Sequence, residues 1–240
     1  MKSIVTKHFD NIASQYDYYK KKNSFYYSSL KLLLHGLIPP DKNILEIGCG
    51  TGDILSFLKP KLGVGIDISS KMIDIARKKY PMENLHFVTS PIDSYKTQLQ
   101  FDYILMADVV EHLTDIDKSF KFISKLTTHD TIFINTMINP IWEPLLAAAE
   151  KLNMKMPEGP HKRISFEYLK EIASIHGLKI ITHSYFLLCP IEIPFVTRIL
   201  NSIIEPYLRK FTFIEYFTAT RSLSSSKKRS NLPKEARLHS

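Results

Sequence analysis

At residues 45–52 the sequence reads Leu-Glu-Ile-Gly-Cys-Gly-Thr-Gly. This stretch overlaps the end of a short apolar run, Asn43–Ile47, and opens a helical pattern. Glycines at alternate positions let the backbone turn sharply and come close to a ligand. In doubly wound α/β sheets, such a turn lies at the carboxyl ends of the strands, where ligands bind. The stretch therefore predicts an α/β fold with a ligand site directly after its first strand.

The spacing of these glycines argues against a dinucleotide-binding loop. Such loops follow Gly-x-Gly-x-x-Gly, which seats a pyrophosphate at a helix amino terminus. Here the spacing is Gly-x-Gly-x-Gly, and Asp53 replaces the third dinucleotide glycine. An acidic side chain at that position would oppose a diphosphate and would suit an ammonium group. We therefore expect a ligand without phosphate.

Strand and helix patterns alternate after the loop. Further mostly apolar runs occur at Leu62–Asp67, Leu85–Val88, Phe101–Ala107 and Thr131–Met137. Helical patterns lie between them at Ser69–Tyr80 and Asp117–Leu126. Short runs that are apolar throughout are typical of parallel strands buried on both faces, and the alternation indicates right-handed crossovers.

Helices and two more strands are expected around this core. The amino-terminal Phe9–Leu34 is predicted to be helical. Later helices are predicted at Leu145–Leu152, Phe166–His176 and Val196–Arg209, and strands at Leu178–Leu187 and Phe211–Thr220. Most of the apolar segment Tyr185–Tyr216 is interpreted as the last strand pair with a covering helix. A ligand tunnel, a dimer face or a membrane-surface helix remains open.

A second chemical signal is the acid at the tip of the second strand, Asp67, 19 residues after Gly48. A carboxylate there can accept hydrogen bonds from both hydroxyls of a ribose. The two signals together resemble the class I S-adenosylmethionine (SAM)-dependent methyltransferases, whose first motif is similar to the glycine loop and whose ribose-binding acid corresponds to Asp67. Phe101–Leu113, which contains Val-Glu-His-Leu, is similar to the fourth motif of the branch that methylates small molecules such as quinones and sugars. Phe9–Asp17 is similar to that branch's amino-terminal Phe-x-x-x-Ala-x-x-Tyr-Asp pattern.

The resemblance implies a doubly wound, mostly parallel seven-stranded sheet of the Rossmann-like methyltransferase kind, with an N-terminal helical cap. The chain is expected to divide into a helical cap at 1–41, a SAM-binding methyltransferase domain at 42–223 and, from its composition, a disordered basic tail at 224–240. Many members carry Asp at the adenine position, where this chain has Ser90 followed by Pro91. Backbone groups and apolar contacts are then expected to hold the adenine. The expected SAM contacts are Tyr16, Glu46, Gly48, Cys49, Gly50, Gly52, Asp67, Ile68, Met72, Ser90, Pro91, Ile92, Ala107 and Asp108.

Two histidines are candidate bases. Methyl transfer depends mainly on positioning, and a base is needed only where the acceptor must lose a proton. His112 follows the fourth strand, where a structural hydrogen-bonding role is equally open, and His161 lies in the loop 156–163 on the side where acceptors enter in this family. Neither lies at metal-ligand spacing, so no metal site is expected.

Composition and charge exclude some classes of protein. The net charge is +8, but Ser224–Ser240 alone carries five Lys or Arg against one Glu, which leaves the rest of the chain about +4. Nucleic acid is therefore not the expected partner, and the Lys- and Tyr-rich stretch Lys20–Tyr27 is interpreted as a solvated helix face with buried aromatics. Two cysteines and the lack of a signal-peptide pattern fit a cytoplasmic protein. Peripheral membrane contact and the oligomeric state stay open.

The first hypothesis is a SAM-dependent methyltransferase that acts on a small-molecule O- or N-acceptor. A hydrophobic or lipid-linked acceptor is one form of this hypothesis. An enzyme acting on RNA or protein is the alternative, followed by a catalytically silent SAM-fold module or a nucleotide-binding dehydrogenase. The segment after the fourth strand reads Asp108-Val109-Val110-Glu111 rather than Asn/Asp/Ser-Pro-Pro-aromatic, which argues against methylation of adenine N6.

Overall fold

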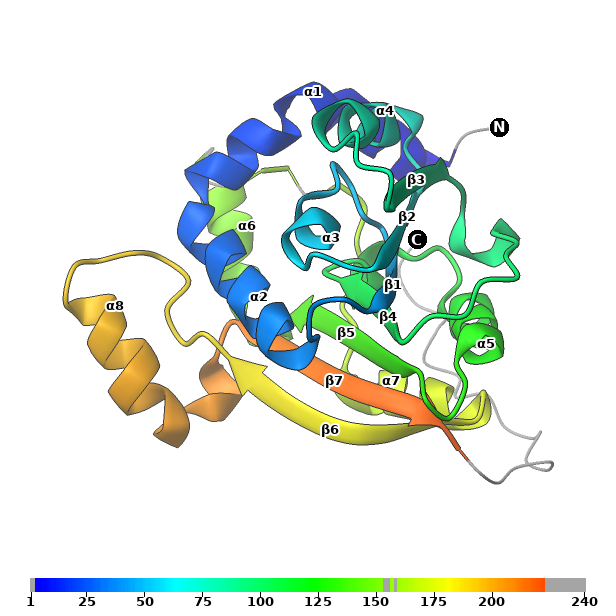
Figure 1. Cartoon of the computed structure of the whole chain (residues 1–240). Coiled ribbons are helices and arrows are strands. Elements are labelled where there is room, and N and C mark those ends of the chain that lie inside the picture. The colour runs from blue at the N-terminus through cyan, green and yellow to red at the C-terminus, as the bar shows by residue number, and fades with distance from the viewer. Residues whose placement is uncertain (1–2, 153–155, 158, 223–240) are drawn as a thin grey trace.

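The computed structural model of the 240-residue chain describes residues 3–152, 156–157 and 159–222. The described strands form one sheet in the order β3-β2-β1-β4-β5-β7-β6 (Figure 1). Their bounds are β1 (Asn43–Ile47), β2 (Leu62–Asp67), β3 (Leu85–Thr89), β4 (Tyr103–Ala107), β5 (Ile132–Ile138), β6 (Leu178–Phe186) and β7 (Ile214–Arg221). Strands β1 to β5 pair in parallel, and β7 is antiparallel to both of its neighbours. The predicted mostly parallel, seven-stranded doubly wound sheet is confirmed.

Helices cover both faces of the sheet. Their bounds are α1 (Ile4–Lys22), α2 (Ser24–Leu37), α3 (Asp53–Phe57), α4 (Ser70–Lys79), α5 (Ile116–Leu126), α6 (Glu143–Lys151), α7 (Phe166–Ile175) and α8 (Val196–Ile199). Helix α7 begins as predicted, because the Ser165 hydroxyl accepts a hydrogen bond from the Tyr168 N–H. The amino-terminal helix is two helices rather than one. They meet at Asn23, whose backbone and side-chain nitrogens both donate to the Tyr19 carbonyl.

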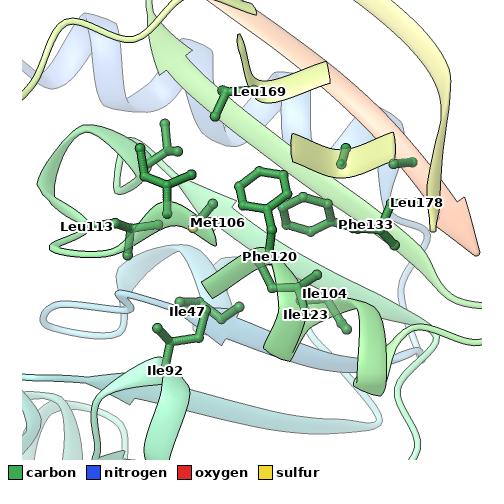
Figure 2. Close-up of a cluster of buried hydrophobic side chains, with 14 of the residues drawn as sticks. Ile47, Ile92, Ile104, Met106, Leu113, Phe120, Ile123, Phe133, Leu169 and Leu178 are labelled. Carbon is green, nitrogen blue, oxygen red and sulfur yellow. The ribbon is translucent and has the colours of Figure 1, made fainter. Parts of the chain in front are cut away.

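The core lies on both sides of the sheet, because neighbouring residues of a strand point to opposite faces. On β4, Ile104 and Met106 pack toward α5 and α7, whereas Leu105 packs on the other face with α2, α3 and α4. Figure 2 shows the first of these layers, in which Phe120 of α5 meets Phe133 of β5 edge to face at 5.8 Å between ring centroids. A sheet covered in this way leaves its strand ends as the place for a ligand.

The segment between β6 and β7 differs from the prediction. It was expected to be a helix that covers the sheet. Instead, α8 is a single short turn followed by a π-helical turn at Leu200–Ile204 and 3₁₀ turns at Glu205–Tyr207 and Arg209–Phe211. Figure 1 shows this segment set apart from the sheet. Many of its apolar side chains are therefore exposed rather than packed in the core.

Two further features bear on the expected partners. None of the helices within the described residues has both the length and the apolar character needed to cross a bilayer. The expected basic tail, 224–240, lies outside the described residues.

Candidate functional site

The chain order of the sheet reverses between β1 and β4, and a cavity of about 410 Å³ lies at the carboxyl ends of these strands. Such a reversal opens a crevice where doubly wound proteins bind ligands. Helices α1 and α2 cover one side of the cavity, and the loop before α7 and the start of the β6–β7 segment border another. All the expected cofactor contacts except Gly52 and Pro91 line this cavity, and so do His112 and His161.

The glycine loop depends on two close approaches. Gly48 has φ +70°, and a Cβ there would lie 2.4 Å from a methyl carbon of Val109 after β4. Gly50 has φ +52°, and a Cβ there would lie 3.3 Å from the Tyr16 ring of α1. The loop backbone therefore contacts both the segment after β4 and helix α1 of the cap. Gly52 begins α3 behind this loop instead of facing the cavity, and Pro91 is exposed on the outside of the turn after β3.

Asp67 is a partly buried acid at the tip of β2. Its Oδ2 accepts a hydrogen bond from the Gly50 N–H at 2.9 Å, and its Oδ1 accepts one from the Ser69 N–H at 2.8 Å. Burial raises the pKa of this carboxyl, and the two N–H groups oppose that rise. The two N–H groups hold the carboxylate in one orientation at the cavity wall. Each of its oxygens has a second lone pair, which can accept a hydroxyl.

Glu46 on β1 is a second buried acid in the cavity wall. It is 2% exposed, and its Oε2 accepts a hydrogen bond from the Leu55 N–H at 3.1 Å. Burial raises the pKa of Glu46 from 4.5 to about 8, although nearby Lys20 lowers it. A carboxyl held in this way becomes easier to ionise when a cation binds beside it.

The helical cap supplies side chains that the sequence interpretation missed. Lys20 lies with its ammonium 4.9 Å from the centre of the Tyr16 ring and 3.0 Å from a carboxylate oxygen of Asp53. Its side chain is only 12% exposed, so this part of the stretch Lys20–Tyr27 is not the solvated face that was expected. The hydroxyl of Tyr26 donates to Asp108, whose other oxygen accepts from Thr136 at 2.8 Å. Lys20 follows the expected contact Tyr16 by four residues on α1, and that spacing could have identified it.

Asp53 does not face the cavity. Burial raises the pKa of its carboxyl, but hydrogen bonds and charge from Lys20, Lys79 and Tyr80 outweigh that effect and hold it well below its usual range. Lys79 bridges Asp53 and Asp17 of α1 at 2.6 and 2.7 Å. The acid that replaces the dinucleotide glycine therefore fastens the cap to the sheet domain, rather than facing a ligand ammonium as the sequence suggested.

Two further contacts fix α1 in place. The Ser69 hydroxyl at the start of α4 donates to Asp10 at 2.7 Å. The Thr51 hydroxyl of the glycine loop donates to Asp17, also at 2.7 Å. The cap is thus tied by side-chain hydrogen bonds to the loop and to α4, both of which border the cofactor end of the cavity.

Two histidines also line the cavity. His112 Nδ1 lies 3.1 Å from the Pro160 carbonyl oxygen, and the rings of His112 and His161 are 6.4 Å apart. His161 faces an acceptor on each side, with Nδ1 3.1 Å from the Gly159 carbonyl and Nε2 3.3 Å from Oε2 of Glu143. Among the described residues, no group of three or more His, Cys, Asp or Glu side chains is suited to hold a metal ion. None of these side chains is therefore assigned as a metal ligand.

Glu111, beside His112, is an acid that sequence reasoning did not single out. Its Oε1 accepts from the Ile138 N–H at 3.2 Å, while its buried Oε2 has no hydrogen-bond partner among the described residues. Burial, followed by the charge of Asp108, raises the pKa of Glu111 from 4.5 to about 8. The cavity thus contains an acid that is held in its neutral form at pH 7.

We expect this acid to make the protein less stable as the pH rises. Between pH 4.5 and about 8 the folded protein holds the Glu111 proton and the unfolded chain does not, so the free energy of unfolding falls with pH. Glu111→Gln should remove this loss. Between pH 5 and pH 8 its free energy of unfolding should therefore rise by roughly 1–3 kcal/mol relative to that of the unmodified protein. Thermal unfolding of both proteins from pH 5 to 8 measures the difference. Stabilities that change with pH in parallel for the two proteins would contradict the assignment. Glu46 is present in both proteins and contributes equally to the pH dependence of each.

Comparison with known proteins places this geometry among methyltransferases. A family model described as "Methyltransferase domain" matches residues 19–183. The ubiquinone biosynthesis O-methyltransferase of Pelagibacter ubique (strain HTCC1062) is 36% identical over 147 residues, which cover 57% of this chain and 60% of that protein. The malonyl-[acyl-carrier protein] O-methyltransferase of Priestia megaterium (strain DSM 319 / IMG 1521) is 27% identical over 184 residues, covering 72% and 66%. The chain thus spans less than two thirds of the length of either relative.

The fold also matches a solved structure. N-methyltransferase NodS from Bradyrhizobium japonicum WM9, in complex with S-adenosyl-L-homocysteine, superposes with a TM-score of 0.63 at 14% identity. The match covers 91% of this chain and 99% of that one.

Proposed function

The chain belongs to the methyltransferase-domain family, and we propose that it transfers the methyl group of SAM to the hydroxyl oxygen of a small apolar acceptor. One observation carries the proposal. Acids suited to a ribose and an ammonium line the same cavity as a histidine pair suited to proton transfer.

The cofactor end fits SAM group by group. Asp67, oriented by two N–H groups, would accept the two ribose hydroxyls. Glu46, whose pKa burial raises to about 8, would ionise against the ammonium of the methionine part. Met72 and Ile92 offer apolar contacts to the adenine, beside the buried Ser90. When bound, SAM would supply its sulfonium methyl group for in-line transfer to the acceptor oxygen, with S-adenosylhomocysteine as the leaving group.

The acceptor end favours a neutral hydroxyl over a carboxylate. Glu143 lines it together with the neutral Glu111, and an acceptor that carries a negative charge would have to lie close to Glu143. Apolar side chains surround these acids, among them Phe9, Trp142 and Leu146. A small aromatic or aliphatic body with one hydroxyl suits such a lining, because its apolar surface leaves water.

A hydroxyl acceptor must lose its proton, and His112 suits the role of base. The Pro160 carbonyl can only accept, so the Nδ1 of His112 carries the hydrogen of the neutral ring. Its Nε2 then holds the lone pair that can take the acceptor proton. His161 has an acceptor oxygen near each ring nitrogen, and one of them is the Glu143 carboxyl oxygen. His161 is therefore proposed to contact the acceptor and to be oriented by Glu143.

The first test is ligand binding by the unmodified protein. We expect calorimetry to give dissociation constants on the order of micromolar for SAM and S-adenosylhomocysteine, and no measurable binding of NADH. Incubation with methyl-labelled SAM should then label apolar phenols or alcohols and leave the matching carboxylic acids unlabelled. Tight NADH binding without a response to SAM would reject the proposal, and labelling of the acids alone would reject the hydroxyl acceptor.

A further inference from the structure

The segment 190–211, between β6 and β7, presents its apolar side chains outward. Phe195, Ile199, Ile203 and Tyr207 recur every four residues, so they follow one side of the helical turns. Phe195 and Tyr207 are 85% and 86% exposed. The segment also stands apart from the sheet in Figure 1.

Its polar side chains face inward and hold the segment in this orientation. Asn201 bonds both backbone groups of Cys189, accepting at 2.7 Å and donating at 3.0 Å. Glu205 accepts from the N–H groups of Leu187 and Leu188 at 3.1 and 3.2 Å. Thr197 accepts from Ile193 N–H and donates to the Ile191 carbonyl, both at 2.7 Å. Turning the apolar stripe inward would break the bonds of Asn201 and Glu205 to residues 187–189, so its exposure is built into the fold.

Charge and position indicate what covers the stripe. Arg198, Arg209 and Lys210 are exposed in this segment. Of its two acids, Glu192 is exposed, whereas Glu205 accepts hydrogen bonds from two backbone N–H groups. Ile191 is 59% exposed on this surface and also lines the cavity, next to Pro190. An apolar path therefore leads from the stripe into the acceptor end of the cavity.

We propose that the segment 190–211 docks on the surface of an anionic lipid bilayer, with Phe195, Ile199, Ile203 and Tyr207 inserted at the interface. A protein partner or a second copy would not need these exposed cations, whereas anionic headgroups pair with them. Docking brings the Ile191 path to the membrane, so an apolar acceptor could pass from the bilayer into the cavity without crossing water. Only this entry of the acceptor from the bilayer rests on the proposed function.

Vesicle sedimentation tests the docking with the full chain. We expect the protein to bind vesicles of phosphatidylcholine with phosphatidylglycerol more strongly than vesicles of phosphatidylcholine alone. Phe195→Ser with Ile203→Ser should lower the partition coefficient by about tenfold or more, because two large apolar groups no longer leave water. Arg209→Glu with Lys210→Glu should abolish the preference for the anionic vesicles.

The matched control is Ile4→Ser with Leu32→Ser, which removes two apolar side chains of similar exposure, 74% and 66%, from α1 and α2. This variant should bind vesicles like the unmodified protein. Binding that survives Phe195→Ser with Ile203→Ser would overturn the proposal, and so would a dimer that this variant disperses in the absence of vesicles. S-adenosylhomocysteine binding, measured on the same samples, checks folding. Its absence in the unmodified protein would reject the proposed function and leave the vesicle result intact.

Discussion

His112→Ala should lower the turnover of a hydroxyl acceptor by about 10²–10⁴-fold, the range for loss of a general base. The reason is the tautomer that the Pro160 carbonyl imposes, with the hydrogen on Nδ1 and the lone pair on Nε2. Single-turnover rates with labelled SAM and the acceptor found in the labelling screen measure the effect. The affinity for S-adenosylhomocysteine should stay within about twofold, since His112 makes none of the proposed contacts with the ribose, the ammonium or the adenine.

His161→Ala serves as the matched comparison, because it removes the neighbouring ring from the same cavity wall. Its main expected effect is a higher KM for the acceptor, with a smaller loss in the chemical step. If His112→Ala turns over normally, no base is required, and positioning of the two substrates accounts for the rate. If His161→Ala shows the larger loss in the chemical step, the two roles are exchanged.

Asp67→Ala should weaken SAM binding by about 10–100-fold, because ribose hydroxyls left without a partner cost about 1–3 kcal/mol. The substitution also removes the acceptor for the Gly50 and Ser69 N–H groups, so the glycine loop loses part of its support. Calorimetric titration with SAM and with S-adenosylhomocysteine gives the two affinities.

Asp74→Ala is the matched control, since Asp74 is an exposed acid on the adjacent helix α4. It should bind SAM like the unmodified protein. Asp67→Asn keeps one acceptor oxygen and should fall between the two. An Asp67→Ala protein that melts normally and binds SAM with unchanged affinity would show that the ribose lies elsewhere.

The sheet could be predicted because its signals are local. Each strand from β1 to β5 is a short apolar run that lies within a few residues of its predicted bounds, and the glycine loop needs only its own backbone geometry. The acid Asp67 was found for the same reason: it stands at the end of a strand, and parallel strands bring their ends together.

Side chains that act through distant partners could not be predicted in this way. Lys20 is basic and stands beside two exposed lysines, Lys21 and Lys22, yet it is buried because Asp53, 33 residues later, pairs with it. Glu111 reads as an ordinary charged residue after β4, and its raised pKa depends on burial by the surrounding elements. The β6–β7 segment has a helical pattern of apolar residues, but the pattern cannot tell a face turned toward the sheet from one turned away.

The ties that hold α1 also determine the order in which the molecule can assemble. Asp10 bonds Ser69, and Asp17 bonds Lys79, across 59 and 62 residues of sequence. During synthesis on the ribosome, α1 emerges before either partner exists, and contacts of this separation form only after the intervening chain has been drawn together. The glycine loop and α4 must therefore be in place before the helix can dock. Helix α1, which leaves the ribosome before its partners, is thus one of the last parts of the candidate site to take its final position.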